Sequence, residues 1–205
     1  MRGEDGRRRA IYTPAHVLLA AAAFARPGDR ARSLAALAGG LIPDLPVMAM
    51  VGWERHVAGR DYETIFRDVY RAEPWATVFA LDHSAPLWLL VLALGLALRR
   101  PWLAVLAAAA LLHVAFDLPL HHNDGRPHFW PLTGWVYESP LSYWDPARHG
   151  GAVGLAELAL CAVLATVLWR RFRPPAARAL IAAALAVEAA PRLLFPLLWP
   201  VLYAA

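Results

Sequence analysis

Apolar runs of helical length alternate with short polar segments along nearly the whole chain. Proline, glycine or arginine bounds most of the runs, and no segment shows the strict alternation that is typical of a half-buried strand. Apolar helices are therefore expected at residues 11–25, 31–42, 84–98, 101–120, 151–169 and 176–203. The pattern predicts an all-α fold, a polytopic membrane helical bundle with about five to six apolar helices.

Prolines set the expected ends of several of these helices. Thr13 suits the N-cap of the first run, because Pro14 then takes the first helical position. The segment 43–46, Pro-Asp-Leu-Pro, is expected to end the second helix, and Pro191 and Pro196 to break the last one. The first two runs are shorter than the roughly 20 residues that a bilayer needs, which predicts tilted or partly inserted helices.

Two segments are more polar than the rest. Residues 53–82 carry charges among aromatic and aliphatic positions at helical spacing, which favours an amphipathic helix at the membrane interface. Residues 121–150 form a loop rich in Trp, Pro, Gly and His, and its aromatic rings suit the membrane–water boundary. Both segments are expected to lie beside the membrane helices rather than among them.

The composition agrees with a membrane protein. Hydrophobic residues make up 59% of the chain, and the mean hydropathy is +0.41. A length of 205 residues indicates a single membrane-embedded helical domain (1–205), with a possible site in 13–130 and C-terminal membrane helices in 151–205. The single cysteine, Cys161, excludes a disulfide within the chain and a zinc site built from cysteines.

The net charge of +4 is the excess of 20 basic residues, all of them arginine, over 16 acidic residues. They stand at the ends of apolar runs rather than in a phosphate-binding stripe, so no direct nucleic-acid binding is expected. If the helices alternate in direction, one side of the membrane receives Arg26, Arg30, Arg32, Arg99, Arg100, Arg170, Arg171, Arg173 and Arg178. The positive-inside rule places that side in the cytoplasm, although the Arg7–Arg9 cluster would then lie outside.

A candidate site lies at the end of the apolar run 101–120. His113, Asp117 and His121 follow one another in steps of four, which places them on one face of a helix. Ionisable groups in or beside a membrane segment are costly, so a functional role is the first hypothesis. Imidazole and carboxylate together are ligands for zinc or a similar divalent ion. A mutual hydrogen bond between His113 and Asp117 is the structural alternative.

Other candidate ligands fall on the same side of the membrane as this cluster. They are His16, Asp44, His83, His121 and His122. Each has a plainer explanation: an interfacial histidine, a turn between prolines, a helix cap, or a polar loop. Convergence on one side favours a metal site facing outward, whereas His56 and His149 are expected at the surface.

The order of these residues resembles a known family. Pro14-Ala-His16, Gly39-Gly-Leu-Ile-Pro-Asp44, Asp82-His83-Ser84 and His113-x-x-x-Asp117 resemble the membrane-bound, metal-dependent hydrolases of the LexA-binding inner-membrane type. The resemblance covers residues 13–130 and implies a multi-pass protein of the bacterial cytoplasmic (inner) membrane.

That family is in turn similar to the zinc-dependent phospholipase C and single-strand nuclease superfamily. The resemblance implies that His16, Asp44, His83, His113 and Asp117 bind metal, with His121 or His122 as a further ligand. The superfamily's N-terminal Trp and closing His-x-x-x-Glu have no counterpart here, which implies one or two ions rather than three. The expected metal is zinc, with manganese as the alternative.

These ligands predict a metal-dependent hydrolase that attacks a phosphoester through a metal-activated water. Asp44 and Asp117 are the candidate catalytic carboxylates, with Asp44 as bridging ligand or base. Asp82 or Asp124 would orient a ligating imidazole, and Arg126 and Arg148 are candidate phosphate contacts or solvated interfacial charges.

The expected partners are membrane lipid and a lipid-linked or small phosphoester, and the residues identify no protein partner. A non-catalytic membrane adaptor with a structural metal site is the alternative function. A metal transporter is disfavoured, because the ligands gather at helix ends on one side.

Overall fold

The computed structural model describes residues 13–203, with side chains described as far as residue 190. The described residues form helices joined by loops, which confirms the all-α prediction. The helices are α1 (Thr13–Phe24), α2 (Arg30–Leu41), the 3-10 turn η1 (Ile42–Asp44), α3 (Leu45–His56), α4 (Tyr62–Thr64), the π-helical turn η2 (Ile65–Val69), α5 (Trp75–Asp82), α6 (Ala85–Ala97), α7 (Pro101–Asp117), the 3-10 turn η3 (Pro146–Arg148), α8 (Gly150–Arg171) and α9 (Pro175–Tyr203). The predicted start of the first helix at residue 11 and the basic segment before it lie outside the described residues.

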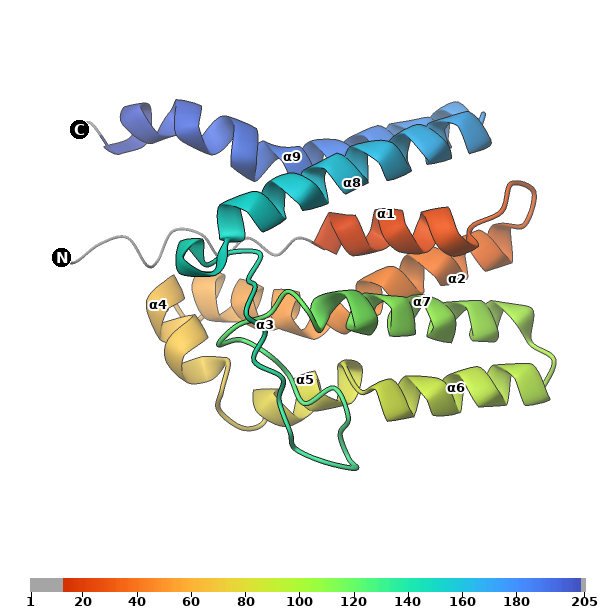
Figure 1. The fold of residues 1–205 in the computed structure, drawn as a ribbon, viewed down its shortest axis with the longest axis horizontal. Coiled ribbons are helices and arrows are strands. Elements are labelled where there is room, and N and C mark those ends of the chain that lie inside the picture. Colours follow the sequence, from red (N-terminus) through yellow and green to blue (C-terminus); the bar gives the residue numbers. More distant parts are fainter. Residues whose placement is uncertain (1–12, 204–205) are drawn as a thin grey trace.

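Helices α1, α2 and α7 form the centre of the bundle, with α6 against α7 and with α8 and α9 against α1 (Figure 1). Their close approach depends on small residues. A Cβ atom on Gly39 would lie 2.2 Å from the Leu106 carbonyl oxygen, and one on Gly40 would lie 2.8 Å from the His16 carbonyl oxygen. Small residues allow helix backbones to pack this closely in membranes. The Gly39-Gly40 pair therefore lets α2 lie directly between α1 and α7.

The buried apolar side chains form two separate clusters. One joins α1, α2, α7, α8 and α9 and is built largely from alanine. The other lies beyond η1, where Val47, Met50, Ile65, Val69 and Phe79 pack together. The second cluster fixes α3, η2 and α5 beside the end of α7.

Helix α2 ends at Leu41, just before the segment 43–46 as predicted, but the chain stays helical through η1 and α3, which the prolines were expected to prevent. Pro43 and Pro46 each lie in the first turn of a new helical segment, η1 and α3, where a missing backbone N–H is tolerated. The result is one helical run of 27 residues from Arg30 to His56.

The interruptions expected elsewhere also differ. Residues 53–82 form the end of α3, α4, η2 and α5 instead of one interfacial helix. Helix α9 continues past positions 191 and 196 as a single element. A proline costs a helix one hydrogen bond and bends it, but the helix need not end there.

Among the described residues, two helical segments are long and apolar enough to cross a membrane: Arg30–His56 and Gly150–Arg171. The pair α5 and α6, bent by 44°, would make a third span. This agrees with a membrane protein but gives fewer spans than the five to six apolar helices predicted. The 12 residues of α1 extend only about 18 Å, which is short of a hydrocarbon core of roughly 30 Å.

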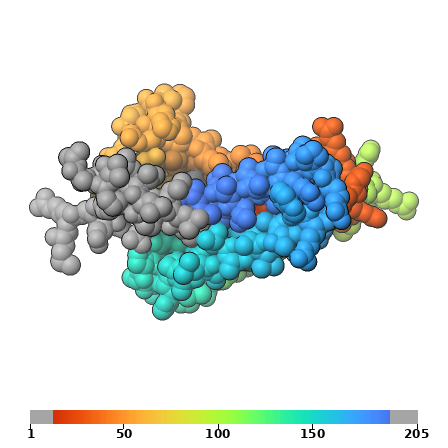
Figure 2. Space-filling view, turned by 90° about the horizontal axis from the view of Figure 1, so that it is seen from above, coloured from red at the N-terminus to blue at the C-terminus, as the bar shows by residue number. Residues whose placement is uncertain are grey.

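The arginine-rich turns lie together. The α1–α2, α6–α7 and α8–α9 connections are all at one end of the bundle, on the right in Figure 1. At the other end, α3 and α4 (orange) and the loop that follows α7 (teal) lie on opposite sides of α8 and α9 (Figure 2). The predicted site residues lie toward this second end.

Candidate metal centre

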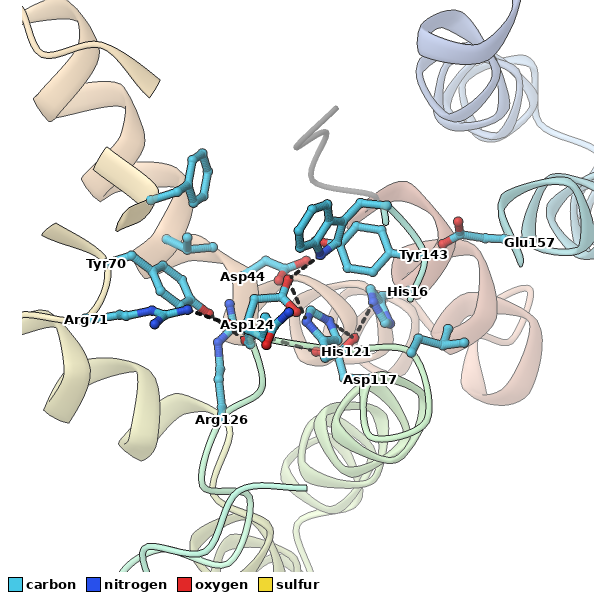
Figure 3. A pocket seen from close by; sticks show the side chains of 15 residues that line it. His16, Asp44, Tyr70, Arg71, Asp117, His121, Asp124, Arg126, Tyr143 and Glu157 are labelled. Carbon is cyan, nitrogen blue, oxygen red and sulfur yellow. Dashed lines mark hydrogen bonds and ion pairs between the residues drawn. The ribbon is translucent and has the colours of Figure 1, made fainter. Parts of the chain in front are cut away.

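Four histidines converge on the carboxylate of Asp117, the last residue of α7. The Nε2 atoms of His16 and His121 lie 3.0 and 3.5 Å from Asp117 Oδ1. Those of His83 and His113 each lie 3.3 Å from Asp117 Oδ2. Figure 3 shows His16 and His121 directed at Asp117 from different elements. One carboxylate thus has imidazoles on both of its oxygens.

Each of these histidines comes from a separate place in the fold. His113 stands one turn before Asp117 on α7, as the i, i+4 spacing predicted. His16 lies in the first turns of α1, His83 follows α5, and His121 lies in the loop after α7. His83, His113 and Asp117 are at most 4% exposed, so these three side chains are shielded from solvent.

The opposite side of three of the rings faces an oxygen atom, to which His113 and His83 are hydrogen-bonded and His121 is not. Nδ1 of His113 donates to the Gly40 carbonyl oxygen at 2.9 Å, Nδ1 of His83 contacts Asp82 Oδ1, and Nδ1 of His121 lies 3.2 Å from Asp124 Oδ2. Such partners hold a ligating imidazole in one tautomer and one orientation. A neutral ring with its proton on Nδ1 presents the Nε2 lone pair to Asp117.

Lone pairs that face carboxylate oxygens repel one another unless a cation lies between them. In the described structure, Nε2 of His113 and Nδ1 of His16 make no hydrogen bond although both are buried. Unpaired buried polar atoms are expensive, so a ligand for them is favoured. The donor set of imidazole and carboxylate fits zinc or a similar ion.

Two triplets have the spacing of metal ligands. One is His16, His113 and Asp117, and the other is Asp44, His83 and His113. Within each triplet the ligand atoms lie within 4.8 Å of one another, and every side chain is at most 10% exposed. The described residues can therefore hold a metal ion, and His113 belongs to both possible positions.

Asp44 is positioned by the first residue of α1. The Thr13 hydroxyl donates to Asp44 Oδ2 at 2.7 Å, while Asp44 Oδ1 lies 3.6 Å from His113 Nε2. Thr13, which the sequence predicted as the N-cap, is instead the first helical residue of α1, and its hydroxyl orients a candidate ligand.

Replacing Thr13 by valine is expected to lower the free energy of unfolding by about 1.5–3 kcal/mol, because a buried hydrogen bond to a carboxylate is lost. Thermal unfolding in detergent measures this. Thr166→Val is the matched control, since its exposed hydroxyl donates only to the Ala162 carbonyl oxygen of its own helix. Equal losses of stability in the two variants would contradict the role of Thr13.

An open cavity of about 90 Å³ lies next to the cluster. Four predicted ligands line it, namely His16, Asp44, Asp117 and His121. The lining also includes residues that were not predicted as part of the site, namely Tyr70, Arg71, Asn123, Tyr143, Trp144 and Glu157 (Figure 3). Glu157, which stands eight residues after His149 and so forms no His-x-x-x-Glu motif, lines the cavity from α8. These residues come from segments without a shared motif, so no sequence pattern marked them.

The loop after α7 is fastened over the cluster through Asp124. The Tyr70 hydroxyl donates to the Asp124 carbonyl oxygen at 3.1 Å, and Trp144 Nε1 donates to Asp124 Oδ2 at 3.0 Å. Burial by itself would lower the pKa of His121, but the Asp124 and Asp117 carboxylates raise it to about 10. An ion bound by His121 must therefore displace a proton.

Arg126 brings a positive charge into the cluster. It is 7% exposed; its Nη1 donates to Nε2 of His83 and lies 3.7 Å from Asp117 Oδ2. Arg148, the other predicted phosphate contact, is exposed in η3 and does not line the cavity.

The structure brings together His16, Asp44, His83, His113, Asp117 and His121 of the predicted ligands. His122 is not part of this group: its Nδ1 donates to the Ser139 carbonyl oxygen at 2.8 Å. The neighbouring His128 is buried with neither ring nitrogen hydrogen-bonded among the described residues, and burial lowers its pKa to about 4.

The fold and the cluster define an all-helical protein with two or three candidate membrane spans and a buried group of histidines and aspartates that can bind metal. No family model, no curated protein and no solved structure matches the chain.

Proposed function

We propose that this protein is a metal-dependent hydrolase embedded in the bacterial inner membrane. Its proposed substrate is a phosphoester, and a lipid-linked phosphoester suits the membrane location. The convergence of four imidazoles on Asp117 carries the proposal, because imidazole and carboxylate groups gathered in this way are the usual ligands of a divalent cation. The ordered motifs that resemble the LexA-binding inner-membrane hydrolases support it as well.

Zinc fits this donor set best, with manganese as the alternative. When bound, a divalent ion supplies Lewis acidity and an activated water for attack on phosphorus. Asp117 suits the central ligand better than Asp44 does, since imidazoles face both of its oxygens. Asp44, which lines the cavity and is oriented by Thr13, is proposed to accept the proton. Arg126 offers guanidinium donors to phosphoryl oxygens.

The position of the cluster favours a substrate that reaches it from the membrane. Asp44 lies 14 residues along the helical run that starts at Arg30, or about 21 Å at the rise of an α-helix. This is less than the roughly 30 Å of a hydrocarbon core. With the arginine-rich turns in the cytoplasm, the centre would lie toward the outer face, as the sequence predicted.

Metal analysis of the purified protein tests the proposal. The protein, extracted in detergent without chelator, is expected to hold at least one zinc or manganese ion by mass spectrometry. His16→Ala should lose most of that metal, whereas His56→Ala, a histidine outside the cluster, should retain it.

Hydrolysis of bis-p-nitrophenyl phosphate and p-nitrophenyl phosphate is expected to stop after chelation and to return when zinc or manganese is restored. Absence of metal, with none taken up on titration, would overturn the proposal. Bound metal without hydrolysis of any phosphoester would instead favour the membrane adaptor.

A further inference from the structure

His113 can serve only one ion at a time, although it belongs to both possible ligand triplets. Its Nδ1 donates to the Gly40 carbonyl oxygen at 2.9 Å, which leaves Nε2 as the one nitrogen with a free lone pair. A single lone pair coordinates a single ion. The two triplets therefore cannot both be filled with His113 as a ligand.

His83, the other histidine of the second triplet, already has a cationic partner. Its Nδ1 contacts Asp82, so its Nε2 is an acceptor, and the guanidinium of Arg126 donates to that atom. The same guanidinium nitrogen lies 3.7 Å from Asp117 Oδ2. Arg126 thus occupies the side of the cluster on which a second ion would need His83.

Arg126 is buried and held in this position by aromatic rings. Its guanidinium carbon lies 5.8 Å from the centre of the Tyr70 ring and 5.7 Å from that of the Phe79 ring. Phe79 belongs to the apolar cluster beside α7. An arginine keeps its charge at any ordinary pH, and aromatic faces stabilise it. A metal ion next to this fixed charge would be repelled.

We infer that Arg126 takes the place of a second metal ion, so that the centre holds one ion, bound by His16, His113 and Asp117. The inference rests on the proposed function in requiring that the centre bind metal. Three protein ligands leave a coordination position open, which is the usual form of a catalytic zinc site. The guanidinium supplies the second positive charge, and its Nε is buried with no hydrogen-bond partner among the described residues.

Zinc stoichiometry distinguishes this arrangement from a two-ion centre. Detergent-purified protein, stripped and titrated with zinc, is expected to bind one ion per chain by native mass spectrometry and elemental analysis. Arg126→Met should bind two, because Asp44, His83 and Asp117 Oδ2 can then hold a second ion without His113, whereas Arg126→Lys should stay at one. Arg71→Met is the matched control and should stay at one, since Arg71 lines the same cavity but is exposed and donates to the Asn123 carbonyl oxygen.

Inorganic phosphate provides a second readout. With zinc at one equivalent per chain, calorimetry is expected to show phosphate binding at least tenfold weaker in Arg126→Met than in the unmodified protein. Two ions in the unmodified protein, or one ion in a folded Arg126→Met, would overturn the inference and leave the proposed hydrolase intact. No zinc in the unmodified protein would overturn the proposed function itself. If Arg126→Met does not fold, the zinc count of the unmodified protein and of Arg126→Lys still decides between one ion and two.

Discussion

Replacing Asp117 by asparagine is expected to abolish tight metal binding. The substitution keeps the size of the side chain but removes the charge on which His16, His83, His113 and His121 converge. Loss of a residue that hydrogen-bonds to a metal ligand commonly lowers metal affinity by about 10- to 100-fold. Loss of the central ligand itself should therefore lower it by more than about 100-fold.

The metal-free protein should also become less stable. Asp117 is 4% exposed and neighbours the buried Arg126, and breaking a buried ion pair typically costs about 3–5 kcal/mol. Differential scanning fluorimetry with and without zinc measures both effects: Asp117→Asn should start from a lower Tm and show no rise on addition of zinc.

Asp68→Asn is the matched control for Asp117. Asp68 is an exposed carboxylate paired with Arg67 in η2, and its loss should change neither the Tm by more than about 1 °C nor the response to zinc. A zinc-dependent rise in Tm that persists in Asp117→Asn would show that the metal is held elsewhere.

Gly39→Ala is expected to lower the free energy of unfolding by about 3 kcal/mol, the upper part of the range for overpacking. The new Cβ atom would lie 2.2 Å from the Leu106 carbonyl oxygen and 2.7 Å from Ala109 Cβ, so α2 and α7 must separate. Metal affinity should fall with stability, because His113 stands on α7 and its Nδ1 partner, Gly40, stands on α2.

Gly52→Ala provides the comparison for Gly39→Ala. Gly52 lies inside α3 with no atom within 4 Å of the position of a Cβ, so alanine should raise stability by about 0.5–1 kcal/mol through helix propensity. Thermal unfolding measures the stability of the two variants, and zinc titration measures their metal affinity. Similar behaviour of the two would mean that α2 and α7 do not pack as closely as described.

Local patterns were sufficient for the class of fold and for several helix ends. The apolar run after Ser84 begins as α6 with the Ser84 hydroxyl accepting from the Leu87 amide, as expected of a helix cap. The run from Pro101 became α7, and its i, i+4 spacing placed His113 and Asp117 on one face. Such features depend on residues a few positions apart, which a sequence displays directly.

The effect of the prolines on the helices was harder to predict from the sequence. The segment 43–46 has the composition of a helix end, yet it lies within a helical run of 27 residues. Whether a proline ends a helix depends on whether its neighbours can close the gap in hydrogen bonding, and here η1 and α3 restart the helix at once. The contacts of this run with α1 and α7 stabilise the helical conformation that its local sequence disfavours.

The order of residues is enough to predict a helical, apolar chain and to mark the residue types that can bind a metal. Three features follow from the three-dimensional packing alone: Asp117 lies at the centre, His121 rather than His122 faces it, and Arg126 contacts His83 from 43 positions away. The physical reason is that helix periodicity is a local property. The meeting of α1, η1, α5 and α7 depends instead on packing at Gly39 and Gly40 and on a loop fastened through Asp124, which no short pattern records.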